Sequence, residues 1–178
     1  MSLSIIHSRA IAGLRALPVQ VEADLANGLP NFSIVGLPDT AVREARDRVR
    51  AAITNSGFDF PQRRVTVNLA PADLPKDSGR FDLPIALGIL VASGQIKSPH
   101  LNSLISRWEF VGELSLTGNL LPIRGAFALA MGVLHQAQGH RSLVLPYSNR
   151  DEVSLTASSQ FGFAESLRDV TDFLAGAK

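Results

Sequence analysis

The chain has 178 residues, 46% of them hydrophobic, which is long and apolar enough for one globular domain with a core of its own. It contains no cysteine, and this excludes a disulfide scaffold, a thiol nucleophile and the common cysteine-based zinc sites. The net charge of +1, from 17 basic and 16 acidic residues, does not by itself indicate a nucleic-acid-binding protein.

Strand and helix patterns follow one another along the chain. In order, they predict strands at 3–11, 18–26 and 31–35, a helix at 41–55, a strand at 64–69, a helix at 82–92, strands at 109–114 and 120–121, a helix at 125–138, strands at 142–145 and 161–164, and a helix at 166–174. Asn27-Gly28 is a strong hairpin signal, so the strand at 31–35 is expected to return beside the strand at 18–26. Strands come first and alternation follows, an order that predicts a mixed α/β domain.

Arginine is concentrated in the predicted helix at 41–55 and just before the strand at 64–69. This segment holds six arginines against three acidic residues: Arg43, Arg46, Arg48, Arg50, Arg63 and Arg64 against Glu44, Asp47 and Asp59. Such a helix face is typical of a phosphate-binding surface, but it is also typical of a solvated face on which arginines pair with neighbouring acids. The residues alone slightly favour the solvated face.

Candidate catalytic and metal sites are incomplete. The four histidines, His7, His100, His135 and His140, show no convergent ligand spacing, so we expect surface or capping roles and no metal site. Asp73, Asp77 and Asp82 are interpreted as turn and helix-capping residues. Lys76 and Ser78 are the residue types of a peptidase dyad, but they share a polar, glycine-containing loop in which Lys76 is expected to be solvated. No Walker A or dinucleotide-binding motif is present, so no cofactor is expected in this domain.

Targeting signals are not evident either. The first residues carry no basic region followed by an apolar stretch and a cleavage site. No apolar run approaches the roughly 20 residues that span a bilayer. We therefore expect a cytoplasmic protein with no membrane partner.

Several long runs, at residues 35–39, 42–53, 67–77, 81–86 and 111–118, resemble one known family. They are similar to the N-terminal domain of the magnesium-chelatase-like AAA+ family, to which the ComM and YifB proteins belong, and the resemblance extends from residue 2 to about residue 174. It implies an α/β (α+β) domain like the proteolytic domain of Lon, with the ribosomal protein S5 domain 2-like fold. It also implies one such domain over residues 1–178, with the ATPase domain that binds ATP and magnesium lying outside this chain.

The resemblance to Lon assigns two positions of its catalytic dyad. Asp82 falls where Lon has its nucleophilic serine, with Phe81 as the other candidate because the loop contains an extra residue, and Phe127 falls where Lon has its lysine. Neither pair of side chains can serve as nucleophile and general base. The resemblance therefore implies a domain with no catalytic residues.

The resemblance further implies a hexameric, ATP-driven motor that moves DNA branches during natural transformation and homologous recombination. This chain would then be a non-catalytic module that aids ring assembly and contacts DNA. The expected phosphate contacts are Arg43, Arg46, Arg50, Arg63, Arg64, Lys76 and Arg80. The alternatives are an oligomerisation or protein-interaction module without DNA contact, and a residual peptidase that uses Ser78 and Lys76. A role in magnesium chelation is suggested only by the name of the family, and no residue pattern in the chain supports it.

Overall fold

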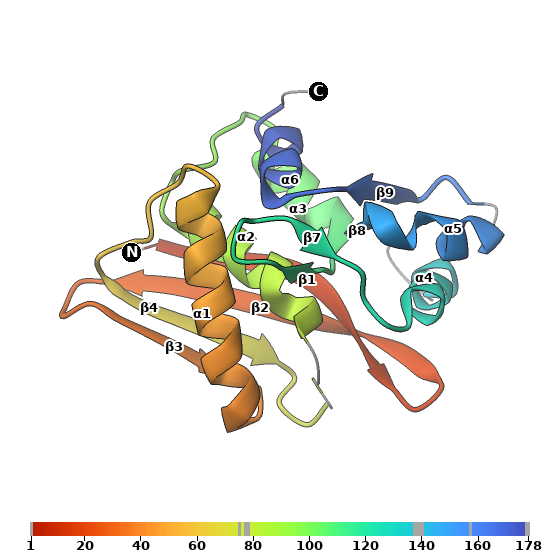
Figure 1. Cartoon of the computed structure of the whole chain (residues 1–178), viewed down its shortest axis with the longest axis horizontal. Helices are drawn as coiled ribbons and strands as arrows, with labels where there is room; N and C mark the ends of the chain where they lie inside the picture. The colour runs from red at the N-terminus through yellow and green to blue at the C-terminus, as the bar shows by residue number, and fades with distance from the viewer. Residues whose placement is uncertain (1, 75, 77–78, 137–140, 157, 177–178) are drawn as a thin grey trace.

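The computed structural model describes residues 2–74, 76, 79–136, 141–156 and 158–176, and it shows a mixed α/β architecture (Figure 1). One seven-stranded sheet has the order β3-β4-β2-β1-β5-β8-β9. Its strands are β1 (Ser2–Ala12), β2 (Arg15–Ala26), β3 (Asn31–Val35), β4 (Arg64–Ala70), β5 (Trp108–Phe110), β8 (Ser142–Pro146) and β9 (Phe161–Ala164). A second, two-stranded sheet is made of β6 (Glu113–Leu114) and β7 (Leu120–Leu121). The predicted α/β class is confirmed.

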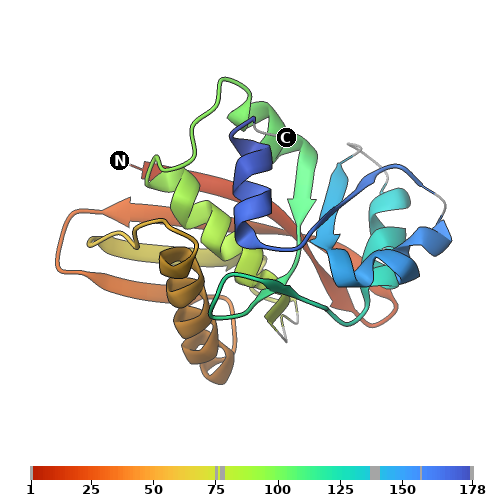
Figure 2. The same ribbon diagram turned by 45° about the horizontal axis from the view of Figure 1, so that its top comes forward.

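Six α-helices accompany these strands in the part of the chain that the structure describes. They are α1 (Asp39–Asn55), α2 (Asp82–Ala92), α3 (Leu101–Arg107), α4 (Ala126–Leu134), α5 (Arg150–Val153) and α6 (Leu167–Leu174), with short 3-10 turns at Gly79–Phe81, Tyr147–Asn149 and Ser154–Thr156. α1 and α2 lie across β1 to β4, and α6 lies farther along the molecule (Figure 2). No helix among the described residues is long and apolar enough to cross a membrane.

The sheet is mostly parallel, although it begins with a long antiparallel hairpin. β1 pairs with β2 from Ser2↔Leu25 to Ala12↔Arg15, and β2 pairs in turn with β4 in antiparallel register. The pairs β3–β4, β1–β5, β5–β8 and β8–β9 are parallel. The predicted hairpin at Asn27-Gly28 is wrong, because β4 lies between β2 and β3. A turn signal is local, whereas β4 pairs with β2 over seven residues and with β3 over five and so takes the place between them.

Hydrophobic clusters cover both faces of the sheet. The alternation along β8 separates them, since Val144 belongs to a large cluster with α1, α2 and α6, whereas Leu143 and Leu145 belong to a smaller cluster with α4. α2 packs closely on the hairpin, where Ser4 Oγ donates to the carbonyl of Gly88 at 2.7 Å. α2 and α4 therefore lie on opposite faces of the sheet.

A buried arginine, Arg9, joins β1 to β5 and to α4. Arg9 in β1 and Glu109 in β5 are at most 2% exposed, and Arg9 Nε lies 2.7 Å from Glu109 Oε1. Arg9 also donates to Glu109 Oε2, to the carbonyls of Ala16 and Gly132, and to Gln136 Oε1. A buried charge is tolerated only when it is paired and hydrogen-bonded, and this one is.

The predicted strand at 109–114 breaks into two pieces. β5 ends at Phe110, and the chain passes through Val111 and Gly112 into β6 of the second sheet. The backbone of Gly112 is held by α2 and by the 3-10 turn before it, because Gly112 accepts from the amide of Leu83 at 3.0 Å and donates to the carbonyl of Arg80 at 2.8 Å. The predicted helix at 125–138 ends earlier, at Leu134, and α3 was not predicted because its seven residues are too few for a clear helical period.

Candidate functional site

Asp82, at the position that the resemblance assigns to a nucleophile, is held in an ion pair. It is the first residue of α2 and is 1% exposed. Its Oδ2 accepts from Arg48 Nε at 2.6 Å and from the amide of Leu114 at 3.1 Å, and its Oδ1 accepts from the Arg48 guanidinium at 3.2 Å. Asp82 thus connects α1 to β6. The predicted capping role is wrong, because α2 has no side-chain cap hydrogen bond at its start.

The protonation of Asp82 is set mainly by burial. Loss of water raises the pKa of Asp82 to about 6, and the nearby carboxylate of Glu113 adds to this. The bonds and charge of Arg48 and the Leu114 amide act in the opposite direction but do not cancel the effect of burial. The same hydrogen bond to Asp82 raises the pKa of Arg48. The pair is therefore a charged guanidinium facing a carboxylate that takes up a proton in mildly acidic solution.

A polar pocket of about 280 Å³ lies beside this pair. It is lined by Thr40, Ala41, Glu44, Arg48, Gly79 and Glu113. Glu44 lies 3.6 Å from Arg48, so the guanidinium faces carboxylates on two sides. Gly79 approaches the Glu113 side chain so closely that a β-carbon there would come within 2.7 Å of it. No group of three or more metal-binding side chains occurs in the described part of the chain.

Two of the seven expected phosphate contacts are buried. Lys76 is 3% exposed, and its Nζ donates to the carbonyl of Leu74 at 3.1 Å. Burial lowers the pKa of Lys76, against the opposing charge of Asp73. Arg80 is 6% exposed. The expectation of a solvated Lys76 is therefore wrong, because the side chain folds back against its own loop, a contact that the sequence does not encode in any local pattern.

The remaining dyad positions are not brought together. Phe127 lies on α4 and is 41% exposed, whereas Asp82 is buried at the start of α2 on the opposite face of the sheet. Phe81, the alternative nucleophile position, is 1% exposed and belongs to the large cluster. Ser78 and Asp77 lie outside the described residues, so a Ser78–Lys76 pair has no described geometry.

The histidines occupy unrelated places. His7 lies half-buried in β1, where burial and the charge of Arg141 lower its pKa to about 4. His100 precedes α3, and His135 follows α4 with its Nδ1 2.8 Å from the Met131 carbonyl. The capping interpretation fits His135, the surface interpretation does not fit His7, and His140 lies outside the described residues.

Five of the predicted arginines lie on α1 and at or just before the start of β4, the two elements beside β3, which is the edge strand of the sheet. Arg43, Arg46 and Arg50 are spaced three and four residues apart, so they form one stripe along α1. Arg46 donates to the carbonyl of Phe32 in β3 at 3.1 Å. Arg64 is paired with Asn31 across β3 and β4 and is exposed, as are Arg43 and Arg50. We call this set, Arg43, Arg46, Arg50, Arg63 and Arg64, the arginine surface.

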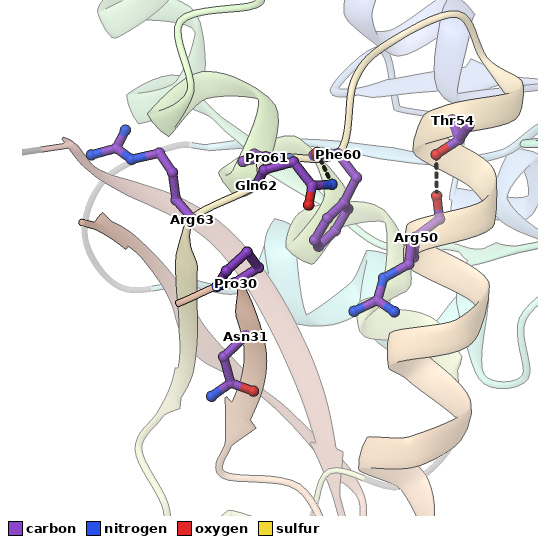
Figure 3. A pocket seen from close by; sticks show the side chains of 8 residues that line it. All are labelled: Pro30, Asn31, Arg50, Thr54, Phe60, Pro61, Gln62 and Arg63. Carbon is purple, nitrogen blue, oxygen red and sulfur yellow. Dashed lines mark hydrogen bonds between the residues drawn. The ribbon is translucent and has the colours of Figure 1, made fainter. Parts of the chain in front are cut away.

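A pocket of about 370 Å³ opens within the arginine surface, between α1 and the loops that precede β3 and β4 (Figure 3). It is lined by Pro30, Asn31, Arg50, Thr54, Phe60, Pro61, Gln62 and Arg63. The Arg50 guanidinium carbon lies 5.0 Å from the centroid of the Phe60 ring, close enough for a cation–π contact. In Figure 3 Arg50 points toward Phe60 and Asn31, and Arg63 points away from it. The Arg63 guanidinium lies 3.4 Å from the carbonyl of Leu25.

Sequence reasoning missed Arg48 and Phe60. Arg48 is one of several charges on the helix, but it follows Ala45 by three residues and precedes Ala52 by four, so it lies beside the buried stripe of α1. An arginine in that place indicates a buried acidic partner. Phe60 carried no such signal, because its contact with Arg50 joins a loop to a helix.

Comparison with known proteins identifies related chains. The model of the family described as subunit ChlI of Mg-chelatase matches residues 21–149. Competence protein ComM of Haemophilus influenzae is 48% identical over 176 residues, which cover 99% of this chain and 33% of that protein. The uncharacterized protein YifB of Escherichia coli is 46% identical with the same coverage, and an uncharacterized protein of Mycobacterium tuberculosis is 37% identical over 183 residues, which cover 99% of this chain and 34% of that protein. The chain thus spans about a third of the length of these relatives.

Proposed function

The chain belongs to the family described as subunit ChlI of Mg-chelatase, and on that premise we propose that it is a non-catalytic module of a DNA-handling ATPase, with the arginine surface as its DNA contact. The kinship with competence protein ComM supports a role in the uptake or integration of DNA. The proposed whole protein is a hexameric, ATP-driven branch-migration motor whose ATPase domain binds ATP and magnesium. The proposed fold of this module is the Lon-like, S5 domain 2-like one, and its proposed location is the cytoplasm.

The observation that carries the DNA contact is the arrangement of the arginine surface. Arg43, Arg46 and Arg50 form one stripe along α1 beside the edge strand β3, and Arg43 and Arg50 are exposed. Arg64 is also exposed, but the alternation of β4 places it on the face of the sheet away from α1. Acidic residues are close to the stripe, but the ion pairs of the described residues assign Glu44 to Arg48, not to the arginine surface. A row of guanidinium groups binds phosphates without reading sequence. Lys76 and Arg80 are left out of the proposed contact because they are buried.

The test is a DNA titration at two salt concentrations with a charge-neutral variant. The affinity of the chain for a labelled duplex should fall as salt rises, because each neutralised phosphate releases counterions. Replacing Arg43 and Arg50, the exposed arginines of the α1 stripe, by Gln should lower the slope of log affinity against log salt by roughly 2, at about 0.9 per lost phosphate contact. The control replaces the exposed Arg107 and Arg124 by Gln, outside the arginine surface. Undetectable binding at low salt, or binding that salt does not weaken, overturns the DNA contact.

The non-catalytic assignment has its own support and test. Asp82 is committed to Arg48 and to the Leu114 amide, which leaves it unsuited to act as a nucleophile. The chain should therefore leave unfolded casein intact. Cleavage that disappears in both Ser78→Ala and Lys76→Met would establish the alternative, a residual peptidase.

A second candidate function, subunit packing without DNA contact, is favoured by exposed apolar residues on β1. Leu3 and Ile5 are 55% and 38% exposed and line a shallow pocket of about 390 Å³ with Ile105 of α3. Isolated exposed apolar residues are ordinary, but two on one strand face form a patch. Sedimentation of the chain with and without Ile5→Glu decides this candidate, which requires a larger species that the substitution dissociates.

A further inference from the structure

The pocket within the arginine surface has the size and composition of a ligand site. Its volume of about 370 Å³ lies in the range of small-molecule and cofactor pockets. Two prolines give it rigid apolar walls, while Asn31 and Gln62 bring side-chain amides and Arg50 brings a charge (Figure 3). A simple phosphate contact needs only charge, so the aromatic ring and the amides indicate a ligand with a flat apolar part and a polar edge.

Arg50 is held in place by aromatic rings rather than by an acid. Its guanidinium carbon lies 5.0 Å from the Phe60 centroid and 5.9 Å from that of Phe32. The two rings are 5.1 Å apart, and Phe32 is only 2% exposed, so Phe60 is anchored to the core. The ion pairs found among the described residues do not include Arg50. The result is an exposed, planar cation whose orientation is set before any ligand binds.

The backbone beside Arg50 is also fixed. Thr54 Oγ1 donates to the carbonyl of Arg50 at 3.0 Å, within the helix (Figure 3). Gln62 makes only a long contact of 3.5 Å from its Nε2 to the carbonyl of Phe60. An amide side chain carries two donors and an acceptor, which match the donors and acceptors on the edge of a nucleobase.

The geometry points to a binding pocket for one unpaired nucleotide of a DNA single strand. The base stacks on the Arg50 guanidinium supported by Phe60, and the amides of Asn31 and Gln62 bind its edge. Guanidinium planes and aromatic rings are the platforms on which single-stranded nucleic acids stack their bases, whereas the bases of a duplex are covered by their neighbours. Arg46, which precedes Arg50 by four residues on the α1 stripe, would bind a flanking phosphate. This inference rests on the proposed function, since it assumes that DNA reaches the arginine surface.

The experiment compares single-stranded and duplex DNA of equal length with Arg50→Lys. This substitution keeps the charge but removes the plane. The affinity for a mixed-sequence single strand should fall about fivefold, at the lower end of what one stacked base contributes. The affinity for the blunt duplex should stay within about twofold, because a duplex offers phosphates only. Phe60→Leu should reproduce the single-strand loss without touching any charge.

The matched control is Arg150→Lys. Arg150 also lies over an aromatic ring, 4.6 Å from the Tyr147 centroid, but it is far from the pocket in the sequence and lines no part of it. It should change neither affinity. Thermal melting followed by circular dichroism verifies that each variant is folded. If Phe60→Leu does not fold, the result for Arg50→Lys alone still decides the test.

Each remaining outcome has one meaning. If Arg50→Lys lowers both affinities equally or neither of them, the nucleotide pocket is wrong while the DNA contact stands. A free deoxynucleoside monophosphate can be added at a concentration equal to that of the nucleotide units in the single strand. If it then displaces the strand, the pocket binds free nucleotides and the assignment to a DNA strand fails. If neither DNA binds at low salt, the proposed function itself has failed.

Discussion

Replacing Asp82 by Asn should change how the stability of the chain depends on pH. Burial raises the pKa of Asp82 from an ordinary 3.8 to about 6. An acid with a higher pKa in the folded state binds more protons when folded, so the free energy of unfolding falls as the pH rises between these two values. Well below pH 3.8 Asp82 is protonated in both states, and its burial costs little. Above about pH 6 Asp82 is ionised in a site from which water is excluded, and this lowers the free energy of unfolding.

The size of the effect follows from the shift. Each pKa unit corresponds to about 1.4 kcal/mol, so a shift of about 2 units destabilises the folded state by about 3 kcal/mol once Asp82 is fully ionised. Most of this, about 2 kcal/mol, should develop between pH 4 and pH 7. The asparagine of the variant would not titrate, and its amide oxygen would still accept from Arg48. The stability difference between Asp82→Asn and the unchanged chain should therefore move by about 2 kcal/mol in favour of the variant as the pH rises.

Urea unfolding followed by the fluorescence of Trp108, the single tryptophan, measures this difference at several pH values. Taking the difference at each pH removes the titration of other groups. The control is the same exchange at an exposed position, Asp151→Asn, since the Asp151 side chain is 99% exposed. A flat difference for Asp82→Asn would refute the argument that burial outweighs Arg48.

Three further substitutions test the packing, each measured by urea unfolding. Arg9→Met should cost about 3–5 kcal/mol, because it leaves the carboxylate of Glu109 buried without its partner, and a loss below about 1 kcal/mol would contradict the buried pair. Gly132→Ala should cost about 1–3 kcal/mol, because its β-carbon would lie 2.5 Å from that of Ala16, and an unchanged midpoint would show that α4 shifts freely. Ser166→Ala should cost about 1 kcal/mol, because it removes the side-chain cap of α6, whereas Ser166→Asp should restore it.

The elements of the fold could be predicted, but their neighbours could not. Periodicity located α1, α2 and α6, because each covers the sheet with an apolar face or is apolar throughout. The place of β3 could not be predicted, since the hairpin signal at Asn27-Gly28 is local and the sheet order is decided by β4, which begins only at Arg64. The break after Phe110 was missed for the same reason, because contacts with α2 hold Gly112.

The candidate site was predictable to a similar degree. The arginine stripe on α1 follows from spacing alone, and two of its three predicted arginines, Arg43 and Arg50, are exposed. The prediction of phosphate contacts at Lys76 and Arg80 is not supported, because both side chains are buried and a polar loop sequence does not reveal burial. The pocket at Arg50 was missed, since Phe60 comes from a loop whose path depends on the whole fold.

The arginines of α1 have two different roles, according to the side of the helix on which they lie. Arg48 lies beside the buried stripe and compensates Asp82, and it is largely covered, with 21% of its side chain exposed. Arg43, Arg46 and Arg50 lie on the other side of the helix, where a guanidinium can meet a ligand. Removing Arg48 would leave the carboxyl of Asp82 buried with only the Leu114 amide as a partner. The attachment of α1 to α2 would be weakened, and with it the position of the arginines on the stripe. Loss of DNA binding in an Arg48 variant would therefore report a displaced helix, and only substitutions on the outer stripe can test the contact itself.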